Sequence, residues 1–238
     1  MNNQAWDHLY LYFSEIENIY DRLTSPELSD QVSLIINELN NTEDNGDLHQ
    51  TELAYSSIEL PPECLEAHAD LLDNIENCKE KLRPLIKEKE LDYVTSALIF
   101  HCDETILTKT LNRLFAEIDC SCSKQAHAPM FMFKSKWPTL QMSMLQCRDG
   151  GERFFNSLDE ISLAPTDYIL AVEVYYFCLK QGFVGRYLDS QHTIDKYKAK
   201  LADVIAANQS KYIPPMTLDL GSTDKTEPTI GGPNAITA

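Results

Sequence analysis

Apolar residues recur at every third or fourth position along most of the chain, which is the spacing of one face of an α-helix. This spacing predicts a first helix over residues 6–23 and a second that begins with Ser25 as N-cap and Pro26 at the first helical position. Over residues 64–85 the apolar positions alternate by four and three, a seam that packs on other helices. Pro84 is expected to interrupt that helix or to start the next, because its ring excludes an interior hydrogen bond.

The rest of the chain extends the helical pattern into a single all-α domain. Residues 85–111 are apolar on more than one side, as in a buried helix. Further helices are expected from Pro138, near Gly151, after Thr166 as N-cap and over residues 188–208, with loops over residues 40–50 and 120–129. We therefore predict about eight helices over residues 1–208, arranged as two small bundles that share the long helices. Residues 209–238 are rich in Pro, Gly and Thr, and are expected to be a disordered tail.

The charge of the chain is strongly negative and unevenly distributed. The net charge is −17, and residues 1–90 hold 20 of the 37 acidic residues but only 6 of the 20 basic ones. Such an acidic front disfavours direct binding to nucleic acid or to an anionic membrane surface, because both carry the same sign of charge. A basic surface of another protein is the favoured partner.

The seven cysteines follow no segment with the basic and apolar regions of a signal peptide. They are interpreted as reduced thiols of a cytoplasmic protein, several of them in helix cores. No stretch reaches the roughly 18–20 apolar residues that span a bilayer, so the chain as given is expected to be soluble.

Two adjacent carboxylates, Asp103 and Glu104, follow the most apolar run of the chain. On a helix they point about 100° apart, so they are not expected to act together on one bond or one metal ion. Burying an unpaired carboxylate is costly. The pair is therefore expected either to form internal ion pairs, with an arginine such as Arg113 or Arg186, or to border a groove that binds a partner.

A metal site is disfavoured by the spacing of the candidate ligands. Cys120, Cys122 and His127 lie together, with His101 and Cys102 elsewhere, but the Cys-x-Cys spacing lacks the Cys-x2-Cys pairs of a structural zinc site. The nucleophile and phosphate-binding motifs of common enzymes are also missing from the sequence. We predict no catalytic residues, no metal and no cofactor.

Two glycine-containing motifs are interpreted as structural. In the segment DGGERFF, Asp149 and Glu152 are expected to form a capping box at a sharp helix entry, with the two phenylalanines in the core. The members of this motif are Gly150, Gly151, Glu152, Phe154 and Phe155.

In the segment GFVGRY, Gly182 is expected to end a helix in a left-handed conformation, and Phe183 to pack back on its last turn. Gly185 permits a second tight bend. Arg186 can reach free carbonyl groups or a carboxylate, and Tyr187 completes the motif.

Three segments in order, ALIFHCDETIL, WPTLQMSMLQCRDGGERFF and VYYFCLKQGFVGRY, resemble the DotU/IcmH family, whose TssL-like members belong to bacterial type VI secretion systems. The resemblance covers about residues 91–188. It implies a hook-shaped pair of helical bundles and a non-enzymatic scaffold at the cytoplasmic face of the inner membrane, which docks baseplate components. The implied partners are a TssM/IcmF-like membrane protein and TssK-like and TssE-like baseplate proteins, with self-association also possible. It further implies a partner-binding cleft beside Asp103 and Glu104.

The chain departs from the family pattern after Asn208, where a transmembrane helix usually follows. Either the chain ends before its anchor, or partners hold an anchorless member at the membrane; the long 117–136 connection is unexplained. Two other interpretations stay open. One is an IcmH subunit of a type IVB secretion system. The other is a helical metal- or small-molecule-binding enzyme that uses Asp103, Glu104 and His101.

Overall fold

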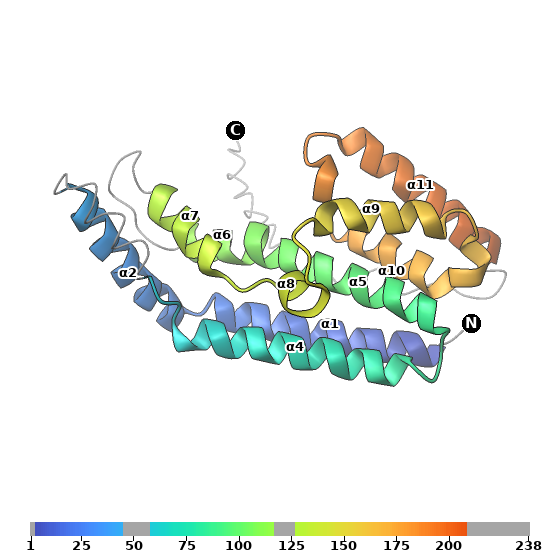
Figure 1. The fold of residues 1–238 in the computed structure, drawn as a ribbon, viewed down its shortest axis with the longest axis horizontal. Helices are drawn as coiled ribbons and strands as arrows, with labels where there is room; N and C mark the ends of the chain where they lie inside the picture. The colour runs from blue at the N-terminus through green and yellow to red at the C-terminus, as the bar shows by residue number, and fades with distance from the viewer. Residues whose placement is uncertain (1–2, 45–57, 117–126, 209–238) are drawn as a thin grey trace, which may run out of the picture.

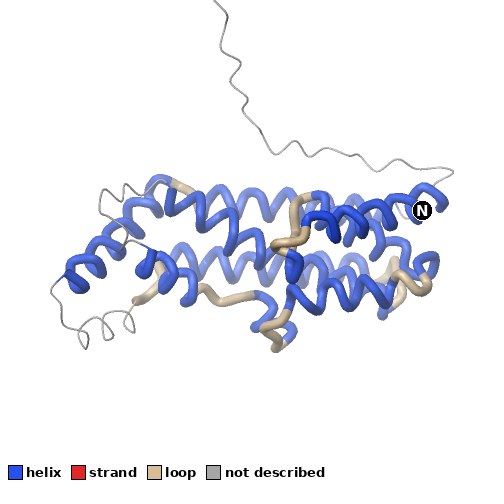
Figure 2. Tube along the Cα trace, turned by 90° about the horizontal axis from the view of Figure 1, so that it is seen from above, coloured by secondary structure: helices blue, strands red, loops and turns tan. Residues whose placement is uncertain are grey.

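The computed structural model describes residues 3–44, 58–116 and 127–208, and all regular structure within these ranges is helical (Figure 2), which confirms the all-α class. The helices are α1 (Asn3–Leu23), α2 (Pro26–Asp44), α4 (Pro62–Leu82), α5 (Glu88–Thr105), α6 (Leu111–Ala116), α7 (His127–Lys136), α8 (Leu140–Leu145), α9 (Gly150–Ile161), α10 (Ile169–Lys180) and α11 (Gln191–Asn208). A π-helical turn covers Ile106–Thr110, and 3₁₀ turns cover Pro165–Tyr168 and Gly185–Tyr187.

The molecule is elongated, with a group of helices toward each end. Figure 1 shows α1 and α4 side by side along the long axis, and α5 running above them. Helices α2, α6 and α7 lie toward one end, whereas α9, α10 and α11 gather at the other. Since α5 contacts α4, α8, α9 and α10, this central helix links the two groups. The arrangement agrees with the predicted pair of bundles that share the long helices.

The core lies where the predicted apolar faces meet. In α4 the seam residues Cys64, Leu71, Ile75, Cys78 and Leu82 are buried. Helix α5 is buried on several sides, as its pattern predicts. The five cysteines within the described residues are buried free thiols. Burial raises the pKa of three of them, Cys64, Cys78 and Cys102, to about 12, so they stay neutral thiols.

Local signals fixed several helix ends as predicted. The hydroxyl of Ser25 accepts the backbone N–H of Leu28 at 3.3 Å, which confirms Ser25 as the N-cap of α2. The break at Pro84 is also confirmed, because α4 ends at Leu82 and α5 begins at Glu88.

Other boundaries were predicted wrongly. Residues 40–44 continue α2, and residues 127–129 begin α7, where loops were expected. Helix α7 is held by tertiary burial, since Phe133 is fully buried and its ring meets that of Phe115 edge-on at 5.7 Å. The helix of the run 85–111 begins only at Glu88, and a π-helical turn at Ile106–Thr110 interrupts its α-helical hydrogen bonding without ending it.

The start of α10 is capped by a distant carboxylate, whereas Thr166 was expected to cap it. Glu90 of α5 accepts the backbone N–H groups of Leu170 at 2.9 Å and Ala171 at 3.3 Å. These N–H groups have no partner inside the helix, and the helix dipole favours a negative charge at that end. The correct cap lies 80 residues away from Leu170, beyond the reach of a local pattern.

Among the described helices, none is long and apolar enough to cross a membrane. The predicted tail over residues 209–238 lies outside the described residues.

Candidate functional site

The three motifs that carried the family resemblance meet at one place, where the end of α5, the start of α9 and the loop after α10 come together. We call this place the motif junction and define it by Asp103, Glu104, Gln141, Gly151 and Gly185. Each of these residues contacts another motif through backbone groups. The junction therefore connects segments that are far apart in the sequence.

Asp103 holds the start of α8. Its two carboxylate oxygens accept the backbone N–H groups of Leu140 and Gln141, each at 2.8 Å. The side chain is almost completely buried, with 3% of its surface exposed. A carboxylate at a helix start satisfies free N–H groups and interacts favourably with the helix dipole. Asp103 therefore acts as a cap supplied from another helix.

Glu104 holds the loop that follows α10 in the same bidentate way. Its oxygens accept the N–H groups of Val184 at 2.7 Å and Gly185 at 2.8 Å. Two successive N–H groups form a concave anion-binding nest when one residue is left-handed, and Gly185 has φ of +47°. The two adjacent carboxylates thus bind two different segments, in agreement with their angular separation on the helix.

The start of α9 joins the same network through Gln141 of α8. The side-chain oxygen of Gln141 accepts the N–H of Gly150 at 2.9 Å. Asp149 instead accepts from the guanidinium of Arg153 at 2.7 Å, so the predicted capping box of Asp149 and Glu152 is wrong. The cap again comes from a residue that folding brings close.

Gly151 and Gly185 let two backbones touch. A Cβ atom added to Gly185 would lie 2.8 Å from the carbonyl oxygen of Gly151, and one added to Gly151 would lie 3.1 Å from the Cα of Gly185. Contacts this short exclude a side chain unless the backbone moves. The close approach explains why both motifs carry glycine at these positions.

The predicted helix end at Gly182 is confirmed. Gly182 has φ of +92°, its N–H binds the carbonyl of Leu179 at 3.2 Å, and the N–H of Phe183 binds the carbonyl of Cys178 at 3.0 Å. This pair of bonds is the Schellman motif.

The aromatic residues of the two motifs pack on each other. Phe154 and Phe155 are fully buried, as predicted. The ring centroids of Phe183 and Phe154 lie 4.1 Å apart, and Phe183 also meets Phe155, so its ring contacts α9. Its expected packing on the last turn of α10 stays a prediction. Tyr187 meets Phe155 edge-on at 4.6 Å. These rings form an apolar base beneath the junction.

Arg186 reaches α9, and the expected carboxylate contact is present. It donates to the side chain of Asn156 at 2.8 Å and lies 3.8 Å from a carboxylate oxygen of Asp159. It does not pair with Asp103 or Glu104, whose oxygens are bound to backbone N–H groups.

Burial raises the pKa of both junction carboxylates. The pKa of Asp103 rises from 3.8 to about 6, because desolvation outweighs the opposing effect of the two N–H donors. Burial also raises the pKa of Glu104. The backbone N–H groups of Val184 and Gly185, and the charge of Lys109, oppose this shift.

The raised pKa of Asp103 predicts a pH dependence of stability. A carboxyl group that binds its proton more tightly in the folded state makes folding less favourable as it ionises, here between pH 3.8 and about 6. The free energy of unfolding of the wild type, relative to Asp103→Asn, should therefore fall by about 2 kcal/mol as the pH rises from 4 to 6.5. Urea unfolding of both proteins across this range measures the difference. Parallel pH profiles would contradict the shift.

The residues of the alternative enzyme site do not converge. Asp103 and Glu104 bind separate backbone segments, and His101 lines a different pocket, against α1. Within the described ranges, no group of three or more potential ligands could hold a metal ion. Cys120 and Cys122 lie outside the described residues, and so does the side chain of His127.

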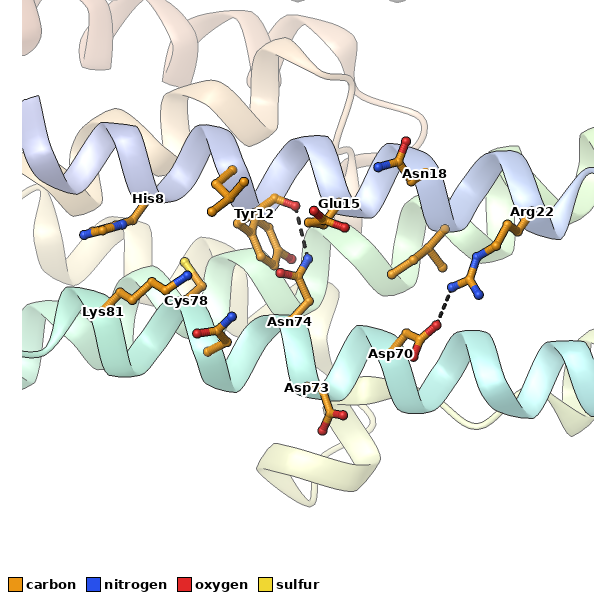
Figure 3. Close-up of a pocket in the computed structure, with 13 residues that line it drawn as sticks. His8, Tyr12, Glu15, Asn18, Arg22, Asp70, Asp73, Asn74, Cys78 and Lys81 are labelled. Carbon is orange, nitrogen blue, oxygen red and sulfur yellow. Dashed lines mark hydrogen bonds and ion pairs between the residues drawn. The ribbon is translucent and has the colours of Figure 1, made fainter.

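Sequence reasoning missed a groove between α1 and α4 (Figure 3), which we call the α1–α4 groove. It has a volume of about 460 Å³. Asn74 donates to the backbone oxygen of Tyr12 at 3.1 Å, and Arg22 and Asp70 form an ion pair across it. Its other polar lining residues are His8, Glu15, Asn18, Asp73, Asn77 and Lys81. The helical spacing of polar residues beside the α4 seam was the signal that could have revealed it.

The partner-binding role predicted for Asp103 and Glu104 is not tested by these contacts and stays a prediction. The other expectation, an internal ion pair with Arg186, is not met, because Arg186 pairs with Asp159 and both carboxylates accept backbone N–H groups.

A comparison with models of protein families agrees with the family that the three motifs indicate. A family model described as type VI secretion system protein DotU matches residues 51–228, which extends beyond the three motifs in both directions. The cytoplasmic domain of TssL from Acinetobacter baumannii is similar at 20% identity and a TM-score of 0.49, over 62% of this chain and 84% of that chain. DotU from Francisella novicida is similar at 18% identity and a TM-score of 0.45, over 73% of this chain and 97% of that chain. No curated protein sequence matches the chain.

Proposed function

Since the chain belongs to the DotU family of type VI secretion system proteins, we propose that it is a non-enzymatic scaffold that docks baseplate components to the membrane complex of such a system. It would work at the cytoplasmic face of the inner membrane. The proposed partners are a TssM/IcmF-like membrane protein and TssK-like and TssE-like baseplate proteins.

The scaffold role is supported by one observation: the motif residues hold backbone segments of different helices together. Asp103 and Glu104 accept four backbone N–H groups from two other segments, and Gly151 and Gly185 pack backbone on backbone. These contacts fix the positions of helices and leave the motif carboxylates without a free oxygen aimed at a substrate. A rigid arrangement of helices is what a docking platform requires.

The α1–α4 groove is the docking face that we propose for a basic partner. It lies in the acidic front of the chain, where residues 1–90 carry 20 acidic and 6 basic residues. Glu15 and Asp73 are exposed and line the groove. Apart from the Arg22–Asp70 pair, Glu15 and Asp73 face only one lysine, Lys81, in the lining, and an excess of negative charge steers a basic partner.

Asp103 and Glu104 would act on partner binding indirectly in this proposal. By holding α8 and the loop after α10, they position surfaces on either side of α5. A loss of partner binding on their substitution should therefore accompany a loss of stability.

Co-purification from native cells tests the docking role. The double variant Glu15→Lys and Asp73→Lys should stay folded, because both side chains are exposed, and should recover at least about tenfold less of the basic partner. The matched control, Asp92→Lys with Glu152→Lys, changes the same charge at exposed positions on α5 and α9 and should bind normally. Mass spectrometry of the captured proteins also separates a type VI from a type IVB complex.

Two outcomes would count against this assignment. Full partner recovery by the folded groove variant would exclude the α1–α4 groove as the docking face. Recovery of no secretion-system protein by the wild type would remove the scaffold role itself.

A further inference from the structure

A second, smaller pocket lies between the end of α5, the π-helical turn, α1 and the end of α10. Its volume is about 190 Å³, below the roughly 300–1,000 Å³ of pockets that bind drug-sized molecules. A space of this size fits one large side chain. We call it the His101 pocket.

The floor of the His101 pocket is aromatic. Phe13 and Phe177 lie with ring centroids 4.4 Å apart, and Tyr20 lines the pocket beside them. Aromatic rings favour contact with a further ring in tilted or offset geometry. The floor is therefore suited to an aromatic side chain.

One polar atom at this pocket is left without a partner. The Nε2 atom of His101 is buried and has no hydrogen-bond partner among the described residues. Burial lowers the pKa of His101 to about 3, so the ring is neutral and each of its nitrogens either donates or accepts a single hydrogen bond. A buried polar atom without a partner is costly, and a ligand that supplied one would remove that cost.

The rim of the pocket carries both signs of charge. Glu17 and Asp21 come from α1, whereas Lys109 and Arg113 come from the π-helical turn and α6. The π-helical turn is a second, independent indication of a functional site, because such widened turns occur frequently at functional sites. A charged rim around an apolar floor is typical of a site that anchors one residue of a protein partner.

We propose that the His101 pocket takes the phenol ring of one tyrosine side chain from a partner protein, with the ring on the aromatic floor and the hydroxyl on His101 Nε2. A phenolic hydroxyl both donates and accepts, so it satisfies either tautomer of the neutral imidazole. Phenylalanine would leave Nε2 unpaired. The identity of the partner rests on the proposed scaffold role, whereas the binding of a phenol does not.

The first test uses p-cresol, the side-chain analogue of tyrosine, and toluene, which lacks the hydroxyl, on the purified full chain. Both are titrated while the imidazole nitrogens are followed by NMR. We expect saturable binding of p-cresol with a shift of the His101 Nε2 resonance, and binding of toluene at least about fivefold weaker. Equal binding of the two probes, or no binding of p-cresol at millimolar concentration, would overturn the proposal.

Two histidine variants make the test specific. His101→Phe should bind p-cresol and toluene equally. His68→Phe is the matched control, because His68 Nε2 is also buried without a partner among the described residues but lies in α4, outside this pocket. His68→Phe should keep the preference for p-cresol. If His101→Phe still binds p-cresol more tightly than toluene, the hydroxyl does not bind His101 Nε2. If His101→Phe fails to fold, Thr105→Phe replaces it, because filling the pocket from its wall should abolish p-cresol binding.

The partner is tested separately by co-purification. His101→Phe should recover at least about fivefold less of one partner, and saturating p-cresol should release that partner from the wild type. If p-cresol binds but partner recovery does not change, a partner tyrosine does not occupy the pocket. The proposed scaffold role would be unaffected by that result. If the wild type recovers no secretion-system protein but still binds p-cresol, the proposed function is wrong and the phenol site remains.

Discussion

Replacing both Asp103 and Glu104 by lysine is expected to unfold the protein, or to lower its free energy of unfolding by at least about 5 kcal/mol. The four N–H groups that these carboxylates accept would lose their partners, and hydrogen bonds to charged groups contribute about 1.5–3 kcal/mol each. A lysine at position 103 would also bury a charge beside a helix start, where the dipole repels it. Since whole domains are stable by only about 5–15 kcal/mol, the loss is comparable to the total.

This expectation differs from the one that the sequence supported. A groove-lining pair would tolerate two lysines in a folded protein. Urea unfolding followed by circular dichroism decides between them, with Asp92→Lys plus Glu152→Lys as a control of equal charge change at exposed positions. The control should change stability by less than about 1 kcal/mol. A double lysine variant as stable as the control would refute the capping role of the junction carboxylates.

The substitution Gly185→Ala is expected to cost about 2–4 kcal/mol. Gly185 has φ of +47°, and a Cβ atom there would lie 2.8 Å from the carbonyl oxygen of Gly151 and 2.9 Å from the ring of Phe183. Neither neighbour moves easily, because the first belongs to the backbone of α9 and the second to a buried ring. Separating α9 from the loop would also strain the bonds to Glu104.

The substitution Gly182→Ala provides the internal comparison. Gly182 also has positive φ, at +92°, but the nearest atom to an added Cβ is the flexible Lys109 Nζ, at 3.3 Å. Its cost should therefore be on the order of 1 kcal/mol, from the left-handed backbone alone. Thermal melts of the two variants measure both values. Equal melting temperatures would show that the approach of Gly185 to Gly151 does not limit stability.

The sequence by itself determined the parts of this protein that depend on neighbours along the chain. The spacing of apolar residues located the buried faces of α1, α4 and α5. Ser25 and Gly182 marked a helix start and a helix end through bonds that span only a few residues. Their partners lie within one turn, so a local pattern contains all the information that such ends require.

The candidate site was only partly visible in the sequence. The adjacency of Asp103 and Glu104 indicated that the two carboxylates would not act together on one bond or one metal ion, and the order of three motifs indicated the family. What the carboxylates bind was not visible, because their N–H donors lie 37 to 81 residues further along the chain. The expected capping box at Asp149 failed because its carboxylate accepts from Arg153, and Gln141 of α8 accepts the N–H of Gly150.

Tertiary structure alone decided how the helices are joined and where the surface is hollowed. Glu90 replaced Thr166 at the start of α10 because a buried carboxylate can satisfy N–H groups from across the core. The α1–α4 groove and the His101 pocket exist because helices from distant parts of the chain leave space between their side chains. Helix periodicity fixes which face is buried, but the partner of each polar group depends on which helices folding brings together.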